Sequence, residues 1–101
     1  LYSNDIYSIP KEISELKELN ILNLNLNKIS IIPTQIFNLI NLKMLHLSNN
    51  QISILPKEIE KLTNLEELQL SNNQISTIPS NINNLIKLRR LYLKSNQIYI
   101  I

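Results

Sequence analysis

A unit of 23 residues recurs along the whole chain, and this period constrains the fold more than any other feature of the sequence. The same residue types return at nine positions of each unit. In the central copy these positions are Leu42, Leu45, Leu47, Asn50, Ile52, Leu55, Pro56, Ile59 and Leu62. One unit alone is too short to bury its apolar side chains, so neighbouring units must stack and share one continuous core.

Within each unit the spacing of the apolar residues changes from two to three. Leu45 and Leu47 alternate with polar residues, which predicts a short strand with one apolar face. Pro56 lacks a backbone donor and holds Leu55 in an extended conformation. Beyond this proline the apolar residues recur at every third position, which suits a short helical or 3-10 segment with one buried stripe, formed by Ile59, Leu62 and Leu65.

Asparagine replaces glycine as the predicted turn residue, because the chain has 16 Asn and no Gly. One Asn per unit follows the strand, and its amide is suited to bonding backbone groups between neighbouring units. We favour this structural ladder over a row of ligand or glycan contacts. Its members are Asn4, Asn27, Asn50, Asn73 and Asn96.

The bulk composition limits the classes of function. A net charge of +2 is too mild to indicate a nucleic-acid partner, and no apolar run reaches the roughly 18 residues of a membrane span. The absence of Cys excludes disulfides and thiolate metal sites. We expect residues 1–101 to form a single domain of about four and a half repeats, uncapped at both ends and able to self-associate there.

The motif Leu42-x-x-Leu45-x-Leu47-x-x-Asn50 resembles the leucine-rich repeat family, in particular its 23-residue class. The resemblance covers the whole chain, and the abundance of Ile, Asn and Lys is similar to that of bacterial repeat proteins of the spirochaete type. It implies an α/β fold, a right-handed leucine-rich-repeat solenoid. A parallel β-sheet would line its concave face, and short helical or 3-10 turns would line its convex face.

In such a solenoid the residues that flank the core leucines of each strand point out onto the concave face. We expect this face to bind a partner, because its residues vary from unit to unit while the core positions repeat. The predicted partner-binding residues are Ile21, Asn23, Met44, His46, Ser48, Glu67, Gln69, Arg90, Tyr92 and Lys94.

No catalytic, cofactor or metal site is predicted. His46 is the single His, and its expected neighbours Asn23 and Gln69 are poor ligands for zinc or iron. We expect a solvent-facing side chain at this position. Ser48 is near it, but no orienting carboxylate that would complete an acyl-transfer site is evident.

Basic residues cluster near the end of the chain, where no acid follows Ser71. The period places Glu66 one unit from Arg89 and Glu67 one unit from Arg90, so we expect both pairs to be adjacent across strands. A solvated, mutually paired strip is therefore favoured over an anion site. The pattern leaves open whether Phe37, Ile40 and Ile86 are partly buried or form a contact on the convex side.

Two functions follow from the resemblance. The first is a non-catalytic protein-protein interaction module that binds its partner, of unknown identity, through the concave face. The alternative is a scaffold or surface-adhesion module for extracellular matrix or glycan ligands. Neither nucleic acid nor membrane is an expected partner. A secreted or cell-surface protein is the expected location, with a cytoplasmic one as the alternative.

Overall fold

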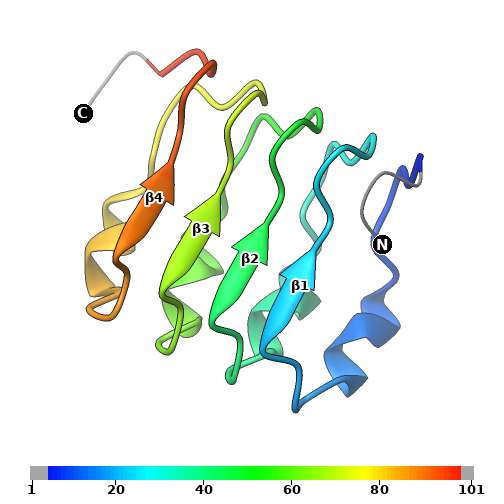
Figure 1. Ribbon diagram of the computed structural model, residues 1–101, viewed down its shortest axis with the longest axis vertical. Helices are drawn as coiled ribbons and strands as arrows, with labels where there is room; N and C mark the ends of the chain where they lie inside the picture. The colour runs from blue at the N-terminus through cyan, green and yellow to red at the C-terminus, as the bar shows by residue number, and fades with distance from the viewer. Residues whose placement is uncertain (1–4, 99–101) are drawn as a thin grey trace.

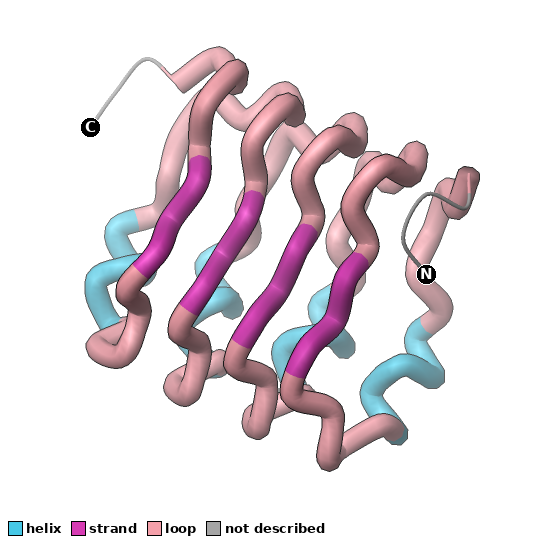
Figure 2. Tube along the Cα trace, in the orientation of Figure 1, coloured by secondary structure: helices cyan, strands magenta, loops and turns pink. Residues whose placement is uncertain are grey.

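The computed structural model describes residues 5–98, which form a right-handed solenoid of stacked coils (Figures 1 and 2). Each full coil contributes one strand and one 3-10 helix. Among these residues the strands are β1 (Ile21–Asn23), β2 (Met44–His46), β3 (Glu67–Gln69) and β4 (Arg90–Tyr92). The helices are η1 (Lys11–Glu15), η2 (Thr34–Asn38), η3 (Lys57–Lys61) and η4 (Ser80–Asn84). No helix in this part of the chain is long and apolar enough to cross a membrane.

The strands form one parallel sheet in the order β1-β2-β3-β4. Each strand residue faces the residue 23 positions later in the chain, as Leu22 faces Leu45 and Leu45 faces Leu68. The 3-10 helices form a second layer behind the sheet (Figure 2). The predicted parallel sheet with short 3-10 turns is therefore confirmed.

The core lies between these two layers. Leu45 and Leu68 from the strands and Ile59 from η3 are fully buried, because each meets an equivalent side chain in the neighbouring coil. A proline in extended conformation precedes every 3-10 helix, and Pro56 before η3 has φ −66° and ψ 149°. It presets the turn into the helix and has no amide N–H that would need a partner there.

A ladder of asparagine side chains, which follow the strands in the sequence, joins neighbouring coils. Nδ2 of Asn50 donates to the carbonyls of Leu24 (3.0 Å) and Leu47 (3.0 Å), and Oδ1 accepts from the backbone N–H of Ile29 (3.0 Å). Each bond to a neighbouring coil satisfies a backbone group that the strand itself leaves unpaired. Equivalent bonds are made by Asn27, Asn73 and Asn96. Asn4 lies outside the described residues.

The residue before each ladder Asn takes a left-handed conformation. Its φ is 60° at Asn49 and 58° at Asn72, which agrees with the predicted use of asparagine in turns. The prediction is wrong at Leu26 (φ 59°) and Ser95 (φ 61°), which adopt the same conformation in the other coils. The hydrogen bonds of the following asparagine impose the turn whatever residue precedes it, although a leucine there is strained by about 1–2 kcal/mol.

The structure decides the burial of the three apolar residues Phe37, Ile40 and Ile86, which the sequence left open. Phe37 in η2 is completely buried and belongs to the core. Ile40 and Ile86 are exposed. Other coils carry Ser14, Glu60 or Asn83 at the position of Phe37, and these residues are not buried. The aromatic ring is therefore a local addition to the repeated core.

Candidate functional site

The register of the sheet arranges the outward side chains of the concave face in rows across the strands. The first row contains Ile21, Met44, Glu67 and Arg90. The middle row contains Asn23, His46, Gln69 and Tyr92. A third row, one step beyond the strands, repeats the same spacing and contains Asn25, Ser48, Ser71 and Lys94. Together these rows hold every residue predicted to bind a partner.

Glu67 is the centre of a hydrogen-bonded cluster on this face, although only 11% of its side chain is exposed. Its Oε2 is 2.6 Å from Nε2 of His46 and accepts from Nε2 of Gln69 at 3.0 Å. Its Oε1 accepts from Nε of Arg90 at 2.7 Å. The predicted pairing of Glu67 with Arg90 is thus confirmed, and the carboxylate is bonded at both oxygens.

The pKa of Glu67 reflects two opposing effects. Burial raises it, but the hydrogen bonds from Arg90 and His46 and their charges outweigh burial and hold the pKa below its ordinary value of 4.5. Glu67 is therefore ionised at neutral pH. Since a carboxylate only accepts, Nε2 of His46 must carry the proton in their shared bond.

The expectation of a solvent-facing His46 is wrong. Its side chain is largely buried and bonds Glu67, which reaches it diagonally from the neighbouring strand. The direct partner of His46 in the register is Gln69, two residues beyond Glu67. Diagonal neighbours lie within reach of long side chains, so the 23-residue spacing, which reveals only direct partners, did not reveal this contact.

Ser48 is buried rather than available for binding. Its Oγ accepts from the backbone N–H of Ser71 at 3.0 Å, and its own N–H donates to Oδ1 of Asn25 at 2.7 Å. Among the described residues its hydroxyl makes no bond to His46. Ser48 therefore fastens neighbouring coils together, and the carboxylate beside His46 does not serve a Ser–His pair.

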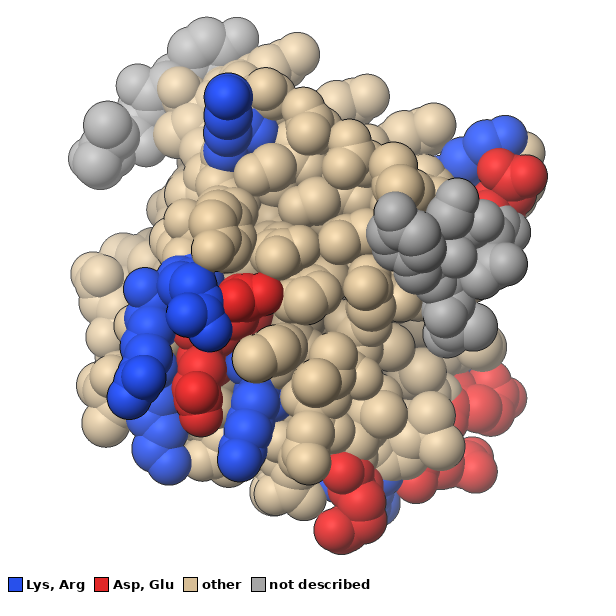
Figure 3. Space-filling model, viewed as in Figure 1, with Lys and Arg blue, Asp and Glu red and all other residues tan. Residues whose placement is uncertain are grey.

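The exposed part of the face is divided between an apolar side and a basic side. On β1 and β2, Ile21 is 53% exposed and Met44 is half-buried. On β4 and just beyond it, the side chain of Arg90 is 51% exposed, Tyr92 is 43% exposed and Lys94 is exposed. Charged side chains gather over β3 and β4, while most of the remaining face is uncharged (Figure 3).

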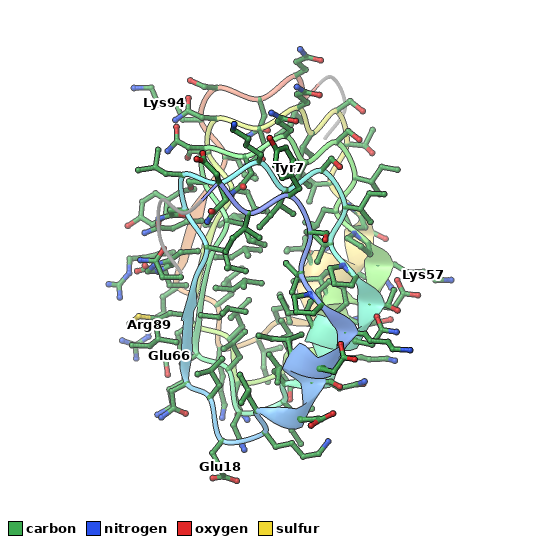
Figure 4. The ribbon with its side chains drawn as sticks, turned by 90° about the vertical axis from the view of Figure 1, so that its right-hand side faces the viewer. Tyr7, Glu18, Lys57, Glu66, Arg89 and Lys94 are labelled. Carbon is green, nitrogen blue, oxygen red and sulfur yellow. The ribbon has the colours of Figure 1, made fainter. Side chains whose placement is uncertain are left out.

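The second predicted pair, Glu66 with Arg89, forms no ion pair within the described part of the chain. The backbone N–H of Arg89 donates to the carbonyl of Glu66. Both residues lie on the sheet side of the molecule (Figure 4), where Arg89 is exposed and Glu66 is half-buried. Exposed pairs gain little from a fixed geometry. The expectation of a mutually paired strip is therefore confirmed for Glu67 with Arg90 and wrong for Glu66 with Arg89.

Replacing Glu67 with glutamine is expected to lower the free energy of unfolding at pH 7 by about 1–3 kcal/mol, because the charge that Arg90 and His46 bond is lost. The folded-state pKa lies below 4.5, so this contribution is complete above that value and is lost as the pH falls through the folded pKa. Urea denaturation should show the difference between wild type and Glu67→Gln shrinking from pH 7 to pH 3.

The matched control is Glu66→Gln, which removes the same charge from a side chain without an ion pair among the described residues. It should change stability by only a few tenths of a kcal/mol at either pH. A deficit of Glu67→Gln that persists undiminished at pH 3 would contradict the assigned pairing.

Among residues 5–98 no group of three or more His, Asp or Glu side chains is placed to hold a metal ion. The concave face instead combines exposed apolar and aromatic side chains with cations whose positions are fixed by the sheet. Such a surface is suited to contact and hydrogen bonding.

Comparison with known families and structures agrees with this geometry. A family model described as a leucine-rich repeat region matches residues 1–91. A leucine-rich repeat protein of Leptospira interrogans is 47% identical, with a TM-score of 0.95, and the match covers 98% of this chain and 25% of that one. No curated protein sequence matches the chain.

Two further solved structures are similar. An internalin of Listeria monocytogenes is 36% identical with a TM-score of 0.86, over 96% of this chain and 27% of that one. The ectodomain of the Arabidopsis thaliana receptor kinase GASSHO1/SCHENGEN3, solved in complex with CASPARIAN STRIP INTEGRITY FACTOR 2, is 42% identical with a TM-score of 0.83. That match covers 90% of this chain and 11% of that one. The chain thus spans about a quarter or less of the length of these proteins.

Proposed function

The chain belongs to the leucine-rich repeat family, and from this premise we propose that it binds a protein partner through its concave face, without catalysis. The resemblance to bacterial members is confirmed by the neighbours from Leptospira and Listeria. The family and these neighbours indicate a protein-interaction module in general terms and no catalytic family. The plant receptor ectodomain, solved with a bound factor, supports a protein as the partner.

The contrast between core and face carries this proposal. The coils of β1 to β3 repeat the same buried strand leucines, and the described full coils repeat the same asparagine ladder, so these positions serve packing. At β4 the equivalent Leu91 is exposed. The middle row of the concave face changes from Asn23 to His46, Gln69 and Tyr92 across successive coils. Side chains that vary at fixed positions favour selective contact, and an exposed aromatic residue such as Tyr92 next to cations is typical of interface centres.

We expect the double variant Tyr92→Ala/Lys94→Glu to lose partner capture by at least about tenfold, because it removes an aromatic contact and reverses a charge on the face. Neither side chain makes a hydrogen bond or ion pair among the described residues, so the fold should be preserved. Capture is measured by immobilising the 101-residue chain, exposing it to cell extracts and quantifying the bound proteins by mass spectrometry.

The matched control is Ile54→Ala/Lys57→Glu, which truncates an exposed apolar residue before η3 and reverses one charge. Lys57 begins η3 and lies on the opposite side from the sheet (Figure 4). Circular dichroism should be the same for all three proteins. If the concave variant retains what the wild type captures while the control loses it, binding occurs on the convex side and the proposal fails. Broad, salt-sensitive binding to matrix proteins or glycans, rather than to one saturable partner, would favour the surface-adhesion alternative.

A further inference from the structure

Resting on the proposed function, we propose that the concave face recognises an extended acidic peptide segment that crosses the strands along the first row. An apolar side chain of this segment lies over Ile21 and Met44, and a carboxylate four residues away binds Arg90. Within the described residues this row contains the apolar pair Ile21 and Met44 at one end and the exposed cation of Arg90 at the other.

The apolar end of the row is formed by two residues of neighbouring strands that face each other in the register. Ile21 and Met44 are direct partners, and Ile21 is more than half exposed. Residue pairs at such positions lie about 5 Å apart and form one continuous surface. They can cover one aliphatic or aromatic side chain of a ligand, which would bury apolar area on both molecules.

At the other end of the row, the guanidinium of Arg90 is held in place and still has donors to offer. Its Nε is bonded to Glu67 at 2.7 Å, and the two terminal amino groups have no partner among the described residues. Arginine binds carboxylates through such a planar pair of donors. Because the Glu67 side chain already serves Arg90, His46 and Gln69 and is largely buried, it presents little of its charge to a ligand.

The neighbours of Arg90 strengthen the preference for an acid. Tyr92 and Lys94 follow at the alternating positions that share one side of an extended chain, and both are exposed. Lys94 projects from the sheet side of the molecule (Figure 4). Two cations, one of them paired with a buried carboxylate, flank an aromatic ring on which ligand backbone can pack.

The geometry of the sheet fixes the spacing of the two ligand groups. Parallel strands lie about 4.8 Å apart, so Ile21 on β1 and Arg90 on β4 are separated by about 14 Å across three intervals. An extended peptide advances about 3.3 Å per residue, and side chains point to one side only at even spacings. Four residues span about 13 Å and return to the same side, whereas three residues reach about 10 Å and point away.

A polyanion fits this face less well than such a peptide. Nucleic acids and sulfated glycans carry negative groups in regular succession. The cations of the three rows, Arg90 and Lys94, lie on β4 and just beyond it, and β1 presents Ile21 and Asn23 instead. A polyanion that crosses the strands would place charge over uncharged and apolar side chains. The observed division between an apolar and a basic side favours a ligand with the same division.

The test uses the 101-residue chain labelled with ¹⁵N and short synthetic peptides in a glycine-serine background. Each peptide contains one leucine and one glutamate four positions apart, in either order, or the same residues three positions apart. Chemical-shift titrations give both the site and the dissociation constant. We expect the peptide with leucine and glutamate four positions apart, in one of the two orders, to shift resonances of β1 to β4. This peptide should bind about tenfold more tightly than those with the two residues three positions apart. Replacing its glutamate with glutamine should also weaken binding about tenfold.

Arg90→Gln and Arg89→Gln form the matched pair of variants, since each removes one positive charge from adjacent positions. Arg90→Gln should weaken binding of the preferred peptide about tenfold, and Arg89→Gln should change it less than about twofold. Equal losses in the two variants, or equal affinity for both spacings, would overturn the proposal in favour of unspecific charge attraction. Tighter binding of an oligodeoxythymidine or a heparin tetrasaccharide at the same resonances would overturn it in favour of a polyanion.

The outcome can be separated from that of the proposed function. If partner capture is lost in Tyr92→Ala/Lys94→Glu while the peptides show no preference for spacing or acid, concave-face binding stands and the peptide proposal fails. If the peptides bind as expected but capture is unaffected by that variant, the face recognises acidic segments and the captured partner binds elsewhere.

Discussion

Phe37→Ala is expected to lower the free energy of unfolding by about 3–5 kcal/mol, which is a large part of the stability of a domain of this size. The ring of Phe37 is completely buried in η2 and packs within the continuous core. Its removal takes away apolar contact and leaves a cavity between coils that the rigid sheet and helices cannot fully close. Urea denaturation followed by circular dichroism measures the loss.

Ile40→Ala is the control for this substitution, because it lies in the same coil and is exposed. It should change the free energy of unfolding by no more than about 0.5 kcal/mol. Similar losses in Phe37→Ala and Ile40→Ala would show that the convex layer is not packed as described.

Asn50→Ala is expected to be the most damaging change to the ladder, at about 1–3 kcal/mol or more. Nδ2 of Asn50 serves the carbonyls of Leu24 and Leu47, and its Oδ1 serves the N–H of Ile29. Alanine leaves the buried N–H of Ile29 without a partner among the described residues. The two carbonyls lose one bond each but still accept from Nδ2 of Asn27 and of Asn73. Thermal unfolding should therefore begin at a temperature several degrees lower in the variant.

Asn96→Ala provides a comparison at the last described rung of the ladder. Asn96 makes the corresponding bonds to Leu70, Leu93 and Ile75, but it is only half-buried. Water can reach the groups it leaves, so we expect a smaller loss than for Asn50→Ala. If both variants lose the same stability, burial does not determine the strength of the ladder.

The coil architecture was predictable because it depends on a signal repeated many times. The alternation at Leu45 and Leu47 and the proline before each helix recur in successive units, so a local ambiguity in one unit is resolved by the others. The pairing of Glu67 with Arg90 was predictable for the same reason, since residues one period apart are direct partners in the sheet.

Features that occur once could not be predicted in this way. Phe37 has no apolar counterpart in other coils, and its burial depends on space between specific neighbours. The contact of His46 with Glu67 depends on the lengths and rotamers of two side chains on a diagonal. These are tertiary effects that a period does not encode.

The constant register of the sheet also affects how the sequence of such a chain can change during evolution. Every strand residue pairs with one 23 positions away, so deleting or duplicating a whole unit preserves the alignment of the remaining strands, whereas inserting one residue would turn leucines outward. Recombination between units can therefore replace all outward side chains of one strand of the concave face in a single step. The Glu67 cluster limits this freedom, because its bonds join β2, β3 and β4 and these three coils must be inherited together to keep it.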